Sequence, residues 1–329
     1  MTDHLEPKLP TLAASMNDLI SGRDRIEIDQ LPSNLMRTCR KKGFDFNILI
    51  AGNYQLGQKE LVESLFGVTL DSSELEMQSA CQMAEGKSYV KEDNVELKDG
   101  NVKLRVKILT TPNFGMRIDE TNSYRPIVKN VKERLSQHLS QEELLYRKKD
   151  MPDCRIHLCL YLLSPAGLPI HPVDLELMKR LCHVCNVVPV IARSDYMTET
   201  ERKLRKEAIT DAIIQHKLKI FQLPQGDPDE DENQWCEHLN QIASRQPFAC
   251  MCDTPGYFDT FYPHEFDAMN ARMSDTVVLR SAIIAHMNEL VDVTHYEHYE
   301  EFRAEVKKRD MSDSLVMRQK VDAVELVDF

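Results

Sequence analysis

Residues 44–66 read FDFNILIAGNYQLGQKELVESLF. The first nine are mostly branched or aromatic apolar residues and end in glycine, which is typical of a buried strand that enters a turn. In the remainder, Leu61, Leu65 and Phe66 recur at the spacing of an amphipathic helix. A strand, a glycine-containing turn and a helix in this order are the setting of a phosphate-binding loop.

The turn keeps only part of the phosphate-binding pattern G-x-x-x-x-G-K-[ST]. Gly52 and Gly57 hold both glycine positions, so the backbone N–H groups can still surround an anion at the start of the helix. Gln58 stands where the pattern has lysine, and Lys59 stands where it has the hydroxyl that holds magnesium. An altered loop of this kind is either a changed phosphate-binding loop or a chance match to the pattern. The rest of the chain has to decide between these two interpretations.

The two replacements change the charge around the loop. Glutamine donates hydrogen bonds but brings no cation to the phosphates, and Lys59 places a cation where Mg²⁺ is recruited. Because a helix turns about 100° per residue, Lys59 also points away from the direction of the missing lysine. We therefore expect GTP or GDP to bind weakly or not at all, and we expect no bound magnesium.

Outside this segment, strand-like and helix-like stretches alternate. Residues 88–110 predict a hairpin, since apolar and polar residues alternate on both sides of Lys98-Asp-Gly-Asn101. Further strand-like runs, separated by amphipathic helical stretches, are RIHLCLYLL, VVPVIA and PFACM. This alternation predicts an α/β fold with a mostly parallel sheet and helices on both faces.

Composition and charge bound the class of protein. The 329 residues are 42% hydrophobic and 29% charged, which indicates a folded globular chain. A net charge of -12 argues against a nucleic-acid partner. No apolar run approaches the roughly 20 residues that span a bilayer, and the nine cysteines, with Cys182 and Cys185 as a lone Cys-x-x-Cys pair, fit reduced thiols. We expect a cytoplasmic protein.

The tract 274–309 predicts a long helix with an apolar stripe at helical spacing. His295 and His298 lie three residues apart in it, which places both on one helix face. Such a pair either packs in an interface or binds a metal, and we favour packing and assign no metal site.

Five stretches together resemble the septin family: RKKGFDFNILIAG, VELKDGNVKLRVKILTTPNFG, MPDCRIHLCLYLLSPAG with HPVDLELMKRL, NVVPVIARSD, and SDTVVLRSAIIAHMNELVDVTHYEHYEEFRAE. The resemblance implies a P-loop NTPase fold of the septin type, a three-layer sandwich with a basic N-terminal segment and a C-terminal helix. It divides the chain into an extension (1–43), a G domain that includes the C-terminal helix (44–305) and a short tail (306–329).

The resemblance also implies where the nucleotide site lies. The septin switch Asp-Thr-Pro-Gly corresponds to Thr110-Thr-Pro-Asn113, which lacks the metal-directed carboxylate. The guanine-recognition segment Ala-Lys-Ala-Asp corresponds to Ala192-Arg-Ser-Asp195, which keeps the acceptor. The predicted remnant of the nucleotide site, with no catalytic residue among its members, is Gly52, Leu56, Gly57, Gln58, Lys59, Glu60, Thr110, Asn113, Arg193 and Asp195.

Septins assemble through two alternating interfaces, one around the nucleotide and one around the terminal helices. The nucleotide-side surface is eroded here, because Leu168 stands where the family commonly has a histidine. The family's lipid-binding segment corresponds to Arg37, Arg40, Lys41 and Lys42, which would favour an anionic phosphoinositide membrane. A solvated basic linker is the alternative for this segment.

Three functions follow as expectations. The leading one is a septin that joins hetero-oligomers or filaments with a degenerate GTP site, in the cytoskeleton, at the cell cortex or in cytokinesis. The second is a septin that binds GTP and hydrolyses it slowly, with Lys59 and Asp195 compensating for the losses. The third is a peripheral phosphoinositide-binding module that forms no filaments.

Overall fold

The computed structural model describes residues 43–54, 56–66, 90–99, 102–111, 114–115, 122–143, 153–167, 169–224, 240–251 and 274–309. Six strands in these ranges form one sheet: β1 (Phe44–Gly52), β2 (Lys91–Asp99), β3 (Val102–Thr110), β4 (Leu158–Leu163), β5 (Val187–Ile191) and β6 (Phe248–Ala249). Their order across the sheet is β2-β3-β1-β4-β5-β6. Only β2, paired with β3, runs antiparallel, which confirms the predicted hairpin and the mostly parallel sheet.

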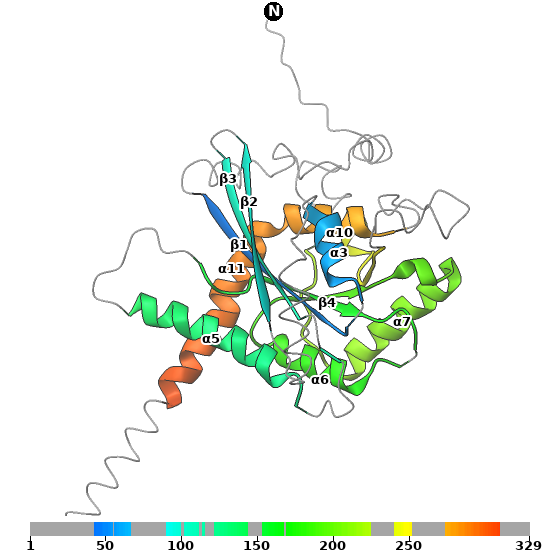
Figure 1. Cartoon of the computed structure of the whole chain (residues 1–329). Coiled ribbons are helices and arrows are strands. Elements are labelled where there is room, and N and C mark those ends of the chain that lie inside the picture. Colours follow the sequence, from blue (N-terminus) through cyan, green and yellow to red (C-terminus); the bar gives the residue numbers. More distant parts are fainter. Residues whose placement is uncertain are drawn as a thin grey trace, which may run out of the picture.

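Helices cover both faces of the sheet (Figure 1). One face packs against α3 (Gln58–Phe66), α10 (Thr276–Ala285) and α11 (Met287–Val293). The other packs against α5 (Arg125–Glu142), α6 (Pro172–Leu181) and α7 (Glu199–Gln215). The predicted three-layer α/β sandwich is therefore confirmed.

Strand β1 shows why its sequence is apolar without interruption. Phe46, Ile48 and Ile50 enter the core beneath α3 and α10, whereas Leu49 and Ala51 enter the core beneath α5 and α6. Side chains alternate between the two faces of a strand, so a strand covered on both faces has to be apolar at every position. This central strand carries the glycine turn at its carboxyl end.

The C-terminal tract is helical, as predicted, but it is not one uniform helix. A break at His286 separates α10 from α11, and residues Thr294–Tyr299 (η3) form a π-helix that continues as α-helix to position 309. The Thr294 hydroxyl donates to the Leu290 carbonyl at 2.7 Å, and Asn186 Nδ2 donates to the same carbonyl at 3.0 Å. Because π-segments form where such groups enter the helical ladder, this irregularity has a local cause.

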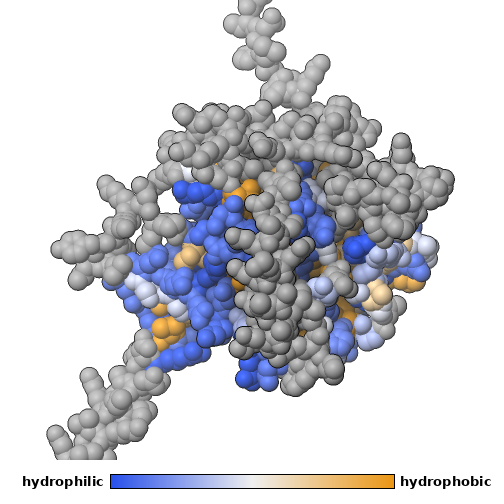
Figure 2. Space-filling model, in the orientation of Figure 1, coloured by the Kyte–Doolittle hydropathy of each residue, from blue (hydrophilic) through white to orange (hydrophobic). Residues whose placement is uncertain are grey.

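The described surface in the view of Figure 2 is mostly hydrophilic, with small separate hydrophobic patches. Large apolar side chains that are exposed include Tyr196, Leu204 and Tyr296. Within the described ranges, no helix has the length and apolar character needed to cross a membrane. The cysteines described there, Cys154, Cys159, Cys182, Cys185 and Cys250, form no disulfide.

Candidate nucleotide site

The glycine loop lies between the end of β1 and the start of α3. A Cβ on Gly52 would lie 2.6 Å from the carbonyl oxygen of Leu162 on the neighbouring strand, so only glycine fits there. Gly57 has φ 77°, a left-handed conformation that glycine adopts without strain. Both glycines of the motif thus serve the turn itself, whether or not a phosphate binds.

Gln58 turns back across this loop and is 9% exposed. Its Nε2 donates to the Gly52 carbonyl at 2.9 Å and to the Thr111 carbonyl at 3.2 Å. Its Oε1 accepts from the Thr111 backbone N–H at 2.9 Å. The side-chain amide therefore pairs with a backbone amide on the segment after β3, and it joins that segment to the loop.

Lys59 extends along α3 instead of toward the loop. Its Nζ lies 3.6 Å from Glu63 Oε1, one helical turn away, and both side chains are partly exposed. Leu56 is buried, and Glu60 on the first turn of α3 is partly buried. The lysine ammonium of Lys59 therefore lies along α3, beside Glu63, and is partly exposed.

The segment after β3 packs directly against the loop. Thr110 is buried at the end of β3, and the Tyr54 N–H donates to the Phe114 carbonyl at 2.7 Å. Gly115 has φ 77°, a left-handed conformation that favours glycine, and a Cβ there would also lie 2.2 Å from Asn53 Oδ1. Asn113, the other predicted switch position, lies outside the described residues.

Arg193 and Asp195 lie on the turn after β5, at the other end of the candidate site. Arg193 has φ 52°, and its guanidinium lies over the Tyr196 ring at 4.7 Å and donates to the Tyr196 hydroxyl at 2.7 Å. Its Nε lies 3.5 Å from Asp195 Oδ1. Arg193 therefore contacts its own turn in this structure.

Asp195 is the exception among these polar residues. Its side chain is 0% exposed, yet neither carboxylate oxygen accepts a hydrogen bond in the described structure. Buried carboxylates are normally hydrogen-bonded, because an unsatisfied buried acceptor is costly. A donor from a ligand, or from a residue outside the described ranges, would satisfy this carboxylate.

Comparisons with known proteins identify the family. The septin family model matches residues 42–314. Septin-2A of Xenopus laevis is 33% identical over 294 residues, covering 87% of this chain and 82% of the relative, and Septin-1 of Drosophila melanogaster is 34% identical over 284 residues, covering 84% and 78%. The chain belongs to the septin family.

Solved septin structures share its fold. Cdc11 from Saccharomyces cerevisiae has a TM-score of 0.54 at 24% identity, covering 80% of this chain and 99% of that chain. The septin GTPase domain from Chlamydomonas reinhardtii has a TM-score of 0.56 at 18% identity, covering 79% and 98%. At these identities the likeness supports the septin fold and nothing finer.

The phosphate end of this septin's site does not fit Mg·GTP. The described loop offers a neutral amide, that of Gln58, at the lysine position and no hydroxyl at the magnesium position. No group of three metal-binding side chains lies within the described ranges. Only the base end fits a ligand, because the Asp195 carboxylate is an acceptor suited to the N–H groups of a guanine edge.

Sequence reasoning missed the partners that close the loop of this septin. The Thr111 backbone N–H donates to Gln58 Oε1, and Asn53 Nδ2 donates to Asp174 Oδ2 at 3.3 Å. The Tyr161 hydroxyl donates to Asp174 Oδ1 at 2.8 Å, so the carboxylate joins β4, α6 and the loop. The only signal for these contacts in the sequence was that polar residues replace the usual ones on both sides of the loop.

Beside the base end of this septin lies a hollow of about 480 Å³. It is lined by residues of two loops and α7, including Gly167, Tyr196 and Leu204. Leu168 and the basic residues Arg37, Arg40, Lys41 and Lys42 lie outside the described residues, so the nucleotide-side surface and the lipid-binding segment stay predictions.

Proposed function

We propose that this septin is an assembly subunit whose nucleotide site does not turn over GTP. The observation that supports it most is the position of Gln58, whose amide bonds Gly52 and Thr111 instead of facing a phosphate. A triphosphate needs cations to offset its charge, and a neutral amide that is already hydrogen-bonded offers none. The loop therefore keeps its backbone conformation but lacks the cation that binds the phosphates.

Magnesium recruitment fails on the same argument. Lys59 stands at the hydroxyl position, and Thr110 stands where septins have the metal-directed carboxylate. The pairing of Lys59 with Glu63 keeps its cation on α3, where it does not replace the missing lysine. Hydrolysis without a metal or a phosphate cation would lack the charge stabilisation on which phosphoryl transfer depends.

Nucleotide content tests the proposal directly. The purified full chain is denatured and any released nucleotide is identified and quantified by chromatography. We expect much less than one GDP or GTP per chain, and no magnesium-dependent phosphate release above buffer. One nucleotide per chain, or phosphate release that is lost in a Lys59→Ala variant, would contradict the proposal.

A second candidate is a septin that binds GTP and hydrolyses it slowly. The observation in its favour is the buried Asp195 carboxylate, which accepts no hydrogen bond in the described structure and is suited to guanine. Calorimetric titration with GTP, GDP and ATP, with Asp195→Asn as the matched control, separates the two. Binding of GTP and GDP but not ATP that is lost in Asp195→Asn supports this candidate. Binding of ATP as tightly as GTP argues against it.

Assembly with other septin subunits is the role we infer for the folded chain. The support is the family membership together with an intact sheet and a well-packed C-terminal helix. Co-expression with other septins, followed by electron microscopy of the purified complexes, tests it. We expect hetero-oligomers or filaments, and a chain that purifies alone in every combination would contradict assembly.

Membrane contact through the basic segment is the third candidate. Four cations within residues 37–42 would each contribute about 1 kcal/mol of attraction to an anionic leaflet. Flotation with vesicles that contain phosphoinositide, compared with neutral vesicles, measures the binding. Changing Arg37, Arg40, Lys41 and Lys42 to Ala should abolish flotation, and unchanged flotation would remove this site.

A further inference from the structure

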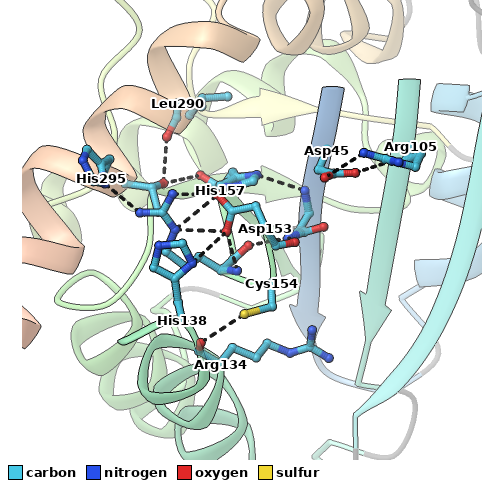
Figure 3. Close-up of polar contacts among 12 residues, drawn as sticks. Asp45, Arg105, Arg134, His138, Asp153, Cys154, His157, Leu290 and His295 are labelled. Atoms are coloured by element: carbon cyan, nitrogen blue, oxygen red, sulfur yellow. Dashed lines mark hydrogen bonds and ion pairs between the residues drawn. The ribbon is translucent and has the colours of Figure 1, made fainter. Parts of the chain in front are cut away.

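A second polar cluster lies far from the glycine loop, where the C-terminal helix meets the start of β4 (Figure 3). It brings together His138 and Glu142 from α5, Asp153, Arg155 and His157 from the segment that leads into β4, and His295 and Tyr299 from η3. We call these seven residues the seam cluster. None of them belongs to the candidate nucleotide site.

An ion pair forms the centre of the seam cluster. Arg155 Nε donates to Asp153 Oδ1 at 3.0 Å, and Arg155 NH2 donates to Asp153 Oδ2 at 2.6 Å. The guanidinium also lies 5.3 Å from the centre of the Tyr299 ring. These contacts hold Arg155 against the helix, with its remaining N–H groups directed at the helix.

His295 receives one of those N–H groups. Arg155 NH1 and His295 Nδ1 are 2.9 Å apart. Arginine can only donate, so His295 Nδ1 has to accept and carries no proton. Protonation of this ring would place an N–H of a cation against the guanidinium and would end the contact.

His157 is an acceptor for the same reason. The backbone N–H of Asn47 donates to its Nδ1 at 3.1 Å, which assigns the proton to Nε2, and Nε2 donates to Asp153 at 3.2 Å. The ring is 0% exposed. A second proton on this imidazole would meet the Asn47 N–H, so the neutral ring is the form that fits.

His138 completes the set of imidazoles. It lies edge-on to the Tyr299 ring at 5.0 Å, and its Nδ1 is 3.9 Å from Asp153. Burial, followed by the nearby Arg155 cation, lowers the pKa of His138, while Asp153 and Glu142 oppose this shift. His295 acts on it in the lowering direction as well.

We propose that the seam cluster is an acid-sensitive latch that holds the C-terminal helix from residue 294 onward against the sheet. The His295 ring accepts from the Arg155 guanidinium and His138 lies near the same cation, whereas His157 accepts from the Asn47 backbone N–H. Protonating them adds positive charge around Arg155, so the docked helix is stable at neutral pH and loosens as the pH falls.

The pH window follows from the direction in which the pKa of His138 is shifted. A histidine whose pKa is lowered on folding binds its proton more readily when released, so stability is lost as the pH falls below the ordinary histidine value of about 6.5. Burial raises the pKa of Asp153, but the hydrogen bonds from His157 and Arg155 together outweigh burial and hold this pKa well below its usual range. The Asp153 carboxylate therefore stays charged throughout this window, and the response comes from the imidazoles.

His298 on the same helix adds to this response. Burial lowers its pKa, against the opposing charges of Glu297 and Glu301, and His183 also faces it. Its ring, however, lies 3.0 Å from Asn186 Oδ1 and donates to that oxygen, because Asn186 Nδ2 donates elsewhere. Protonation of His298 keeps this hydrogen bond, so His298 is not one of the acceptors that define the latch.

Hydrogen exchange of the full chain tests the latch. Amide exchange in 294–309 is compared at pH 7.5 and 5.5 after correction for intrinsic rates, with α3 as an internal reference on the opposite face. Each coupled proton raises the opening constant by up to about tenfold per pH unit. We expect at least tenfold more opening of 294–309 at pH 5.5 and little change in α3. Equal exchange at both pH values would overturn the proposal.

Two variants separate the latch from general acid instability. Asn oxygen can accept from Arg155 as His295 Nδ1 does but is not protonated in this pH range, so His138→Asn/His295→Asn should reduce the acid response to the part carried by His157 and His298. His216→Asn, at an exposed position after α7, should keep it in full. An acid response of full size in the double variant overturns the latch. If the double variant fails to fold, the single His295→Asn gives the same comparison, with a reduced response expected and an unreduced one overturning the latch.

Discussion

The two ends of the candidate nucleotide site differ in how their polar groups are hydrogen-bonded. At the phosphate end, the Gln58 amide has partners within the chain through both of its polar atoms, on Gly52 and Thr111. At the base end, the Asp195 carboxylate is buried without a hydrogen-bond donor in the described structure. One end is complete without a ligand, and the other is not.

The two polar groups should therefore affect the stability of the ligand-free fold differently. A buried amide at the lysine position of the loop stabilises the ligand-free fold, because it satisfies backbone groups within the chain. A carboxylate kept for a ligand costs stability whenever the ligand is absent. Substitutions at the two ends should therefore change the free energy of unfolding in opposite directions.

The seam beneath the C-terminal helix gives the largest expected effect. Asn186 Nδ2 reaches the carbonyls of His157 at 2.8 Å and Leu290 at 3.0 Å, and its Oδ1 accepts from His298. Asn186→Ala should lower the free energy of unfolding by about 3 kcal/mol, because several buried groups lose their partner together. Urea denaturation measures this loss. A loss below about 1 kcal/mol would mean that the hydrogen bonds of Asn186 contribute little to the free energy of unfolding.

Gln58→Ala tests the phosphate end. It leaves the Thr111 N–H and the Gly52 carbonyl without their partner, so we expect a loss of about 2 kcal/mol in the same urea experiment. A loop designed for a ligand would tolerate this change. Unchanged stability would therefore show that Gln58 does not close the loop in solution.

Asp195→Asn tests the base end with the opposite sign. Replacing an unsatisfied buried carboxylate by an amide should raise the free energy of unfolding of the ligand-free chain by about 1 kcal/mol. The midpoint of thermal unfolding should rise with it. A destabilisation similar to that of Gln58→Ala would show that the ion pair with Arg193 outweighs the missing hydrogen bonds of this carboxylate, and the comparison between the two ends would fail.

Lys59→Ala is the smallest expected effect and the matched control for Gln58→Ala. Its pair with Glu63 is partly exposed at (i, i+4) spacing, so removing it should cost no more than about 0.5 kcal/mol. The two variants differ by one position in the same helix. A cost near that of Gln58→Ala would mean that Lys59 contributes to the loop after all.

The sheet was predictable from the sequence because its signals are local. The apolar run of β1 and the alternation across residues 88–110 each predict a strand without reference to distant residues, and β1 and the β2–β3 hairpin are found there. The replacement of the motif lysine by Gln58 is also visible in the sequence. These features depend on residue type and spacing alone.

The state of the site was not predictable, because it depends on partners far along the chain. Gln58 contacts Thr111 across 53 positions, and nothing near Gln58 indicates this pairing. The spacing of His295 and His298 predicted a shared face, but the two rings contact Arg155 and Asn186 from different elements. The packing of helices and strands decides which side chains become hydrogen-bond partners. The local pattern of a single sequence does not reveal these pairs.

Tyr299 has a consequence for how the protein can be shortened. Its ring is fully buried and belongs to the core beneath α5 and α6, although the residue lies near the end of the described helix. A chain that stops before residue 294 would leave an empty aromatic site against α5 and expose apolar surface. Versions made for crystallisation should therefore keep the whole described helix, through residue 309.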